Sequence, residues 1–516
     1  MSKRKKESQN NNSIDNSSHD NNNHLFVKLP FLLLNKIARE FDDIIDTICF
    51  SLVCKRWFEN RNKYLLFNCK DFSSILLKDP NNINSKQFTL NSYMNLFQES
   101  INQKSVYKLL IFSPKNPRYD HISEYLQNKD TNADYYQTLD ELKRSEIPSN
   151  CNWIIMDNCI VIDDDFIDKL ERSNVNTLQL LSDQPGSMRI SRILPSSIKT
   201  IISESPIEQS VLPLELESLN TDAYNQRIDG SLFPRSLKVL KISSYGIRPN
   251  NFGMLPPNLE ELYCPIVNLK KHLDDGDQLP STLKIVTISP DSLNFFGVKI
   301  TSEMIPPNIK YLKLSGSTLF DKNTFSLLQH LETLDLTDLS TIKHQHFGTL
   351  PNSLRSLYLP FTFNKSISSS MVLPRMLEFL DLGYSFDYKI KGLSVLKSLK
   401  TLALSKDMYS ETLKASSIPK SVETLHFKNP LLISPDVIPP TVRSISFTKD
   451  LDPMSLAIQI PQTISSINFR FKSTDFKARR LSKESFLLFG VNQNVTGYFC
   501  NSIKIKDTQQ KINIQF

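Results

Sequence analysis

A short pattern recurs along most of this chain and constrains its fold more than any other feature. Between residues 147 and 469, an anchor residue, usually apolar and usually followed by proline, precedes apolar residues four, seven and nine positions later. Representative copies read LPPNLEELYC, IPPNIKYLKL and LPNSLRSLYL. The anchors stand about 22 residues apart, which is the spacing of a repeat protein, at Ile147, Glu171, Leu194, Leu212, Phe233, Leu255, Leu279, Ile305, Leu327, Leu350, Leu373, Val395, Ile418, Ile438 and Ile460.

The end of each unit alternates apolar and polar residues, which predicts a short strand with one buried face. Proline comes before this strand, where its missing N–H removes no bond between strands. A single unit cannot bury its apolar face, whereas stacked units can, and the period falls in the range of leucine-rich repeats. We therefore expect a leucine-rich-repeat-like solenoid with a concave parallel β-sheet, preceded by a small α-helical domain.

The composition agrees with this interpretation. Of the 28 prolines, twelve follow an anchor directly and three more come one residue later, so about half mark the entry to a strand. The 12 glycines form neither a GxGxxG motif nor a P-loop, the two common phosphate-binding patterns. No CxxC, HExxH or nucleophile elbow occurs. We expect no enzymatic activity, no cofactor and no metal site.

The units resemble FNIP repeats, a leucine-rich-repeat-like group with an LPxSLxxLxL core followed by a Phe-Asn step. The core fits most units between residues 194 and 469, although the unit at Leu327 lacks proline. An asparagine in that step would bond to backbone groups in the turn after the strand. Because many units lack it, we expect no regular asparagine ladder. The step survives as Tyr224-Asn225-Gln226, Phe363-Asn364-Lys365 and Phe386-Asp387.

A different pattern precedes the repeats, in residues 25–67. Leu33, Ile37 and Phe41 recur at helical spacing, and Asp42-Asp43 favour the start of a second helix. The opening Leu-Pro and the closing run SLVCKRW resemble an F-box. The resemblance implies a three-helix unit that docks on the Skp-type adaptor of cullin-based ubiquitin ligases. It also implies a core and an adaptor-binding surface made by Leu29, Pro30, Ile37, Leu52, Val53, Cys54 and Trp57.

These seven residues have two possible roles. An apolar stripe at helical spacing often forms the core, so Ile37, Leu52 and Cys54 can simply hold the helices together. Pro30 and Trp57 lie nearer the ends of the segment, where we expect them to contact a partner.

A concave sheet would expose the residues six, eight and ten positions after each anchor. Tyrosine and arginine are the side chains that most often dominate binding at interfaces. Scattered surface aromatics are also an ordinary feature of proteins, so a binding patch and a plain surface both remain open. The substrate-binding candidates in the middle units are Tyr263, Tyr311, Lys313, Asp335, Tyr358, Phe379 and Asp381, followed later by His426 and Arg470.

The chain thus divides into five segments. An Asn/Ser-rich tail at residues 1–23 should be disordered, because it has few apolar residues to bury. The F-box-like helices at 25–67, a mixed linker or N-terminal cap at 68–146, the repeats at 147–469 and a C-terminal cap at 470–516 follow. The cap contains two alternating, strand-like stretches at 503–505 and 512–514.

Bulk charge and hydropathy limit the partners. The net charge of +7 is dilute, and the one dense basic run, Lys3–Lys6, is either a nuclear import signal or a solubilising tail. No signal-peptide core and no run of about 18 apolar residues occurs. We expect a cytoplasmic or nuclear protein that binds neither nucleic acid nor membrane.

Two functions follow from these patterns. The first is a non-catalytic substrate-recognition subunit of an SCF-type ubiquitin ligase, whose F-box joins the adaptor and cullin complex and whose repeats bind a protein substrate. The second is a scaffold of leucine-rich-repeat-like units with no ligase role, in which the N-terminal helices merely cap the solenoid.

Overall fold

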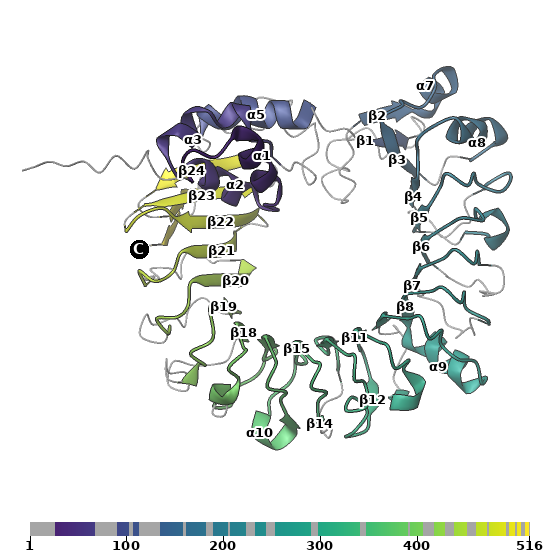
Figure 1. The fold of residues 1–516 in the computed structure, drawn as a ribbon. Helices are drawn as coiled ribbons and strands as arrows, with labels where there is room; N and C mark the ends of the chain where they lie inside the picture. The colour runs from purple at the N-terminus through teal and green to yellow at the C-terminus, as the bar shows by residue number, and fades with distance from the viewer. Residues whose placement is uncertain are drawn as a thin grey trace, which may run out of the picture.

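A computed structural model gives the fold (Figure 1). It describes residues 26–67, 90–102, 107–112, 135–157, 161–181, 189–204, 207–222, 233–243, 253–289, 298–340, 347–390, 393–405, 417–428, 438–450, 461–471, 474–483, 485–491, 495–500, 503–506 and 511–514. The expected disordered tail at 1–23, with its basic run, lies outside these residues.

A parallel sheet forms the inner wall of a curved solenoid, as predicted (Figure 1). One strand of this sheet follows each of the predicted anchors, and it begins six residues after the anchor in every unit except the first. In chain order these strands are β3 (Cys151–Asp157), β4 (Thr177–Leu181), β5 (Thr200–Ser203), β6 (Ser218–Asp222), β7 (Val239–Ser243), β8 (Glu261–Pro265), β9 (Ile285–Ser289), β11 (Tyr311–Lys313), β13 (Thr333–Asp335), β15 (Ser356–Tyr358), β17 (Phe379–Asp381), β18 (Thr401–Leu404), β19 (Thr424–Phe427), β20 (Ser444–Asp450) and β21 (Ser466–Phe471).

A tight turn leads into each strand. The carbonyl of Pro256 accepts a hydrogen bond from the N–H of Leu259 at 3.2 Å, which closes a four-residue turn. The unit at Leu327 has no proline, yet it closes the same turn between the carbonyl of Leu328 and the N–H of Leu331 at 3.0 Å. Proline therefore favours the turn by fixing φ, but the turn forms without it.

A row of mostly alternating charges marks the residue before each strand of the inner wall from β5 to β20, five positions after the anchor. Four neighbouring pairs form ion pairs between units, and their side chains are roughly half exposed, so each contributes little alone. Omitting one unit from the stack would place like charges together at most steps, so the row favours the observed order. Its members are Lys199, Glu217, Lys238, Glu260, Lys284, Lys310, Glu332, Arg355, Glu378, Lys400, Glu423 and Arg443.

Buried phenylalanines stack behind the strands in the middle of the array. The rings of Phe347 and Phe363 lie 5.9 Å apart, and those of Phe363 and Phe386 lie 6.0 Å apart. Asn364 Oδ1 accepts a hydrogen bond from the N–H of Asp387 in the next unit at 3.0 Å. The Phe-Asn step thus contributes a core ring and one bond between units, while its copy at 224–226 lies outside the described residues.

Short helices and strands line the outer side of the arc (Figure 1). Two pairs of short parallel strands lie there, β10 (Val298–Ile300) with β12 (Thr318–Phe320) and β14 (Gly348–Thr349) with β16 (Met371–Val372). The helices between the strands are α7 (Leu139–Arg144), α8 (Asp164–Glu171), α9 (Ile266–Asp274) and α10 (Ile367–Ser370), with single 3₁₀ turns η5 (Gln209–Val211), η7 (Ser302–Met304) and η8 (Leu393–Val395).

The two ends of the sheet are built differently. At the N-terminal end, β1 (Tyr107–Phe112) pairs in parallel with β3, and β2 (Tyr135–Thr138) pairs with β1. At the C-terminal end, β22 (Thr474–Arg480), β23 (Phe486–Val491) and β24 (Val495–Cys500) continue the sheet as antiparallel strands. A separate hairpin joins β25 (Ile503–Lys506) to β26 (Lys511–Ile514).

The N-terminal helices pack on this last, antiparallel part of the sheet (Figure 1). We call residues 26–67 and 90–102 the helical module; it holds α1 (Phe31–Arg39), α2 (Ile44–Ser51), α3 (Lys55–Glu59), the 3₁₀ turn η2 (Arg61–Lys63) and α5 (Asn91–Asn102). Leu487 and Phe489 of β23 belong to its core, and the ring of Phe489 stacks on Phe97 at 6.1 Å. Sequence placed α5 with the cap at 68–146, but α5 belongs to the module.

Polar contacts reinforce this docking. Arg479 of β22 donates from Nε to Asp46 at 2.6 Å and from Nη2 to the second oxygen of that carboxylate at 3.2 Å. Lys477 binds Asp43 at 2.7 Å. Asp43 also caps the N-terminus of α2, since its carboxylate accepts from the N–H of Ile45 at 3.4 Å. The two ends of the described chain therefore meet in one structure.

Candidate protein-binding surfaces

The opening and closing segments of the F-box-like motif lie together in the helical module. Arg56 donates to the carbonyls of Val27 and Leu29, at 3.0 Å for Leu29, and Trp57 Nε1 donates to the carbonyl of Val27 at 3.2 Å. The closing run of the motif therefore holds the segment that carries Pro30. This explains, without reference to any partner, why the two ends of the pattern occur together.

The predicted adaptor-binding residues divide between core and surface. Leu29, Leu52 and Cys54 are half-buried and pack against the core of the module. For Leu52 and Cys54, this agrees with the alternative in which they hold the helices together. Trp57 is only 3% exposed and packs on Phe50 with ring centroids 4.7 Å apart. This burial corrects the expectation that Trp57 faces a partner.

Helix α1 presents apolar side chains to solvent. Leu33 is 43% exposed and Ile37, one turn later, is 38% exposed, while Leu34 and Ala38 face the core. The stripe that begins with Leu33 and Ile37 therefore lies on the exposed side of α1, which favours the surface role over the core role for Ile37. Leu32 is 70% exposed; sequence reasoning missed it, although three successive leucines exceed what one buried stripe needs.

The remaining two predicted residues are also on the surface. Pro30, directly before α1, is exposed, and Val53, in the turn between α2 and α3, is 63% exposed. We call Leu32, Leu33, Ile37 and Val53 the exposed apolar set.

The repeat array presents two columns of side chains on its concave face. The residues six and eight positions after each anchor are partly exposed, except for the buried Ile155 and Ala403, and the strand pairing aligns them across units. Tyr311 and Phe379 lie in the first column, and Tyr263, Lys313, Asp335, Tyr358 and Asp381 lie in the second. The tenth position was also expected to be exposed, and the outcome differs between units. It is buried at Pro265, Ser315, Pro360, Gly383 and Ser405, where the chain turns away after the strand, but partly or fully exposed at Ser289, Thr337, Lys428 and Arg470.

The charged members of these columns already have partners. Lys313 lies 3.4 Å from Asp335 and 2.7 Å from Asp338. Asp335 also accepts from the N–H of Thr337 at 2.9 Å, and from the hydroxyl of Tyr311 at 3.3 Å. These carboxylate bonds hold the turn after the strand, which gives Asp335 a structural role that the sequence did not reveal.

Asp381 repeats this arrangement two strands further on. Its carboxylate accepts from the N–H of Gly383 at 2.8 Å and forms an ion pair with Lys428. Gly383 has φ +80°, a conformation that favours glycine. Asp335 and Asp381 therefore each have a lysine partner on this part of the concave face.

The aromatic members form a row. The rings of Tyr358 and Phe379 lie 4.6 Å apart, and the ring of His426 lies 6.2 Å from Phe379 across the small Ala403. Burial raises the pKa of Tyr358 and lowers the pKa of His426. Both rings are therefore uncharged at neutral pH.

Tyr263, on β8, is separated from Tyr311 on β11 by strand β9 and belongs to a separate group. Lys241 lies over its ring at 4.3 Å, and its hydroxyl donates to Glu261 at 3.1 Å. Burial, followed by that bond, raises the pKa of Tyr263 to about 12.

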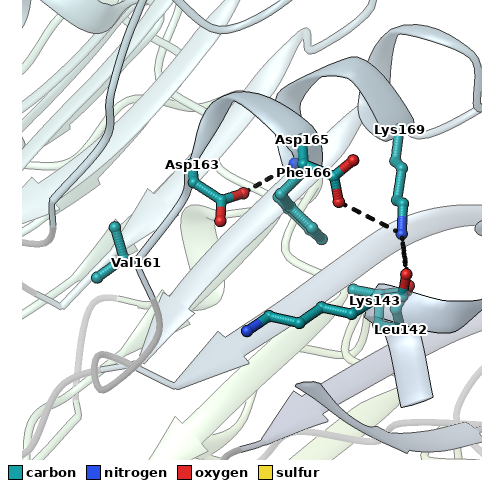
Figure 2. Close-up of a pocket in the computed structure, with 7 residues that line it drawn as sticks. All are labelled: Leu142, Lys143, Val161, Asp163, Asp165, Phe166 and Lys169. Atoms are coloured by element: carbon teal, nitrogen blue, oxygen red, sulfur yellow. Dashed lines mark hydrogen bonds and ion pairs between the residues drawn. The ribbon is translucent and has the colours of Figure 1, made fainter. Parts of the chain in front are cut away.

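A cavity of about 210 Å³ lies beside α8, lined by the residues drawn in Figure 2, and it offers no protein-binding surface. Asp163 caps α8 by accepting from the N–H of Phe166 at 3.0 Å. Lys169 donates to the carbonyls of Leu142 and Lys143 at 2.7 and 3.0 Å. The polar groups of this cavity therefore bind to helix ends, Asp163 to the first turn of α8 and Lys169 to the last carbonyls of α7.

The described residues contain neither a metal-ligand cluster nor a membrane-spanning helix. No three His, Cys, Asp or Glu side chains gather there as metal ligands would. Within the same residues, no helix combines the length and apolar character needed to cross a bilayer. The paired residues His344 and His346 lie outside the described part of the chain.

Comparison with known proteins identifies the repeats. No curated protein matches the sequence. A solved octameric complex of Latrophilin 3 (Lec, Olf), Unc5D (Ig, Ig2, TSP1) and FLRT2 (LRR) contains a chain that matches at 18% identity. The match covers 57% of this chain and 88% of that one, and its TM-score of 0.28 is too low to indicate a shared fold. The FNIP Repeat family model matches residues 345–385 and 409–450. The solenoid therefore contains FNIP repeats.

Proposed function

We propose that this protein is a non-catalytic substrate-recognition subunit of a cullin-type ubiquitin ligase. In this proposal the helical module docks a Skp-type adaptor, and the FNIP-containing array holds the protein to be ubiquitylated. The exposed apolar set on the helical module is the single observation that carries the proposal. The likeness of residues 29–57 to an F-box supplies the identity of the adaptor.

The exposed apolar set calls for a partner on energetic grounds. Fully burying a leucine, isoleucine or valine side chain contributes about 1.5–3 kcal/mol. Four such side chains supply enough apolar contact for the centre of an interface. The face of the module that packs on β22 and β23 is already covered, whereas the exposed apolar set is accessible to an external protein.

The mechanism requires no chemistry from this chain. Bringing a substrate and a ligase into one complex raises the effective concentration of the substrate's lysines at the ligase. The docking of the module on β22 and β23 supports this role, because it holds the adaptor-binding side in a set orientation to the concave face.

A scaffold without a ligase role is the second candidate, and one observation favours it. The module covers the C-terminal part of the sheet, so its inner face is explained by capping alone. Capping does not explain why Leu32 and Val53 are exposed. Deleting the module is a poor test, because both candidates now predict a destabilised array.

Co-purification with a Skp-type adaptor separates the two candidates. We expect the wild-type chain to retain the adaptor, and the double variant Leu33→Asp/Ile37→Asp to lose it with an unchanged melting temperature. Leu214→Asp, on a residue that is 79% exposed in the repeat array, is the matched control and should retain the adaptor. Failure of the wild-type chain to retain the adaptor would leave the scaffold role.

A further inference from the structure

The concave face carries a group of aromatic rings on strands β11 to β19. We call Tyr311, Tyr358, Phe379 and His426 the aromatic row. The rings of Tyr358, Phe379 and His426 follow one another at 4.6 and 6.2 Å, and Tyr311 joins them through its hydrogen bond to Asp335. Five strand spacings of about 4.8 Å give the row a length of about 24 Å, which an extended segment of about seven residues would span.

The charges beside the row exclude two classes of partner. An acidic or phosphorylated segment would have to take Lys313 from Asp335 and Asp338, or Lys428 from Asp381. A basic segment would have to take the same carboxylates from those lysines and from the backbone N–H groups that they bind. Either exchange leaves a charged group buried under the partner without its present bond, which is unfavourable.

The uncharged rings favour the remaining class. His426 directs Nδ1 to the hydroxyl of Ser446, while its ring lies near Phe379. Partly buried rings in a row accept apolar, aromatic or proline side chains, and they add stacking energy to the area that is buried. The flanking residues Thr333, Ser356 and Thr401 offer hydroxyl groups but no charge.

We propose that the aromatic row binds an extended, uncharged segment of a partner protein, with an aromatic, aliphatic or proline side chain over Tyr358 and Phe379. This rests on the proposed function, because it names the chemistry that the array recognises in its substrate. The existing ion pairs give the row its specificity, since a neutral segment leaves them intact whereas a charged segment would have to displace them. The exposed apolar set of the helical module takes no part in binding this segment.

The test uses a phage library of random twelve-residue peptides, panned on the full-length protein and counter-selected on the variant Tyr358→Ser/Phe379→Ser. We expect enriched peptides to carry no charged residue in their consensus and to bind with an affinity that changes less than about twofold between 50 and 500 mM NaCl. Tyr358→Ala or Phe379→Ala should weaken their binding by roughly tenfold or more.

Phe361→Ala is the matched control. Phe361 is a half-exposed aromatic residue of the same unit as Tyr358, but it lies beyond the strand and stacks on Tyr384 with ring centroids 4.4 Å apart. Its loss should leave peptide binding and the melting temperature nearly unchanged. Charged consensus peptides, a steep salt dependence, equal loss with Phe361→Ala or no enrichment over the counter-selection would each overturn the proposal. No adaptor is present in this assay, so its failure is distinct from a failure of the co-purification.

Discussion

Arg479→Ala should release the helical module from the C-terminal strands. Arg479 is the centre of this contact: besides its two bonds to Asp46, its Nη1 donates to Ser466 at 2.9 Å and to Asn468 at 3.3 Å. Its side chain is largely buried, whereas that of Asp46 is more than one-third exposed. The variant leaves Asp43 and Asp46 with only Lys477 as a counter-ion.

The expected size follows from these bonds. A hydrogen bond to a charged group contributes about 1.5–3 kcal/mol when buried, and a solvent-exposed ion pair contributes about 0.2–1 kcal/mol. The contact lies between these limits, so we expect Arg479→Ala to lower the free energy of opening the module by about 2 kcal/mol, roughly a 30-fold rise in the open fraction. Asp46→Ala should cost less, and the double variant should show a coupling of about 1 kcal/mol.

Hydrogen exchange measured by mass spectrometry follows this opening locally. Peptides from α2 and β22 should exchange faster in Arg479→Ala, while peptides from the middle of the array should not change. Arg192→Ala is the matched control, because Arg192 pairs with three carboxylates of α8 at the other end of the array. Unchanged exchange in α2, or additive effects of the two single variants, would refute the reasoning.

Three further predictions test other parts of the fold. Gly383→Ala should lower the free energy of unfolding by about 3 kcal/mol, because φ of Gly383 is +80° and a Cβ there would lie 2.2 Å from a carbonyl oxygen. Gly276→Ala, at φ +89° but in open space, should lower it by only about 1 kcal/mol. Urea unfolding measures both values. Burial raises the pKa of Cys49 and of Cys264 to about 12, so both thiols should resist alkylation at pH 8, and Arg479→Ala should expose only Cys49 to the reagent. Because both thiols stay neutral in the folded protein, stability should be full below about pH 8.5 and fall as the pH rises from there toward 12, seen as a falling melting temperature. Glu332→Lys should place four positive charges in succession and lower stability by about 1 kcal/mol at low salt, and high salt should reduce this loss in thermal melting.

The solenoid could be predicted because its information is periodic. Apolar positions such as Leu259 and Leu262 recur at the same offsets in each unit, and each lies in the core. The alternating charges before the strands recur at a fixed offset too, so that row was present in the sequence although it was not recognised. Periodic features of this kind need no knowledge of distant contacts.

The binding surfaces could be predicted less well, because side-chain partners decide them. Asp335 and Asp381 occupy concave positions, yet each holds the turn that follows its strand. Each carboxylate accepts from the backbone N–H two residues further on, as aspartate in turns typically does. The available signal in the sequence was an aspartate at the last position of the strand. The burial of Trp57 and the docking of Asp46 on Arg479 depend on contacts with no local pattern, the second between residues more than 430 positions apart.

One binding measurement tests the central claim that two separate surfaces join an adaptor to a substrate. The full-length protein is titrated with a Skp-type adaptor, with a peptide selected on the aromatic row, and with both together. We predict that Leu33→Asp/Ile37→Asp abolishes adaptor binding alone, that Tyr358→Ala/Phe379→Ala abolishes peptide binding alone, and that the wild-type protein binds both at once. Competition between the two ligands, or loss of both from either variant, would contradict the account.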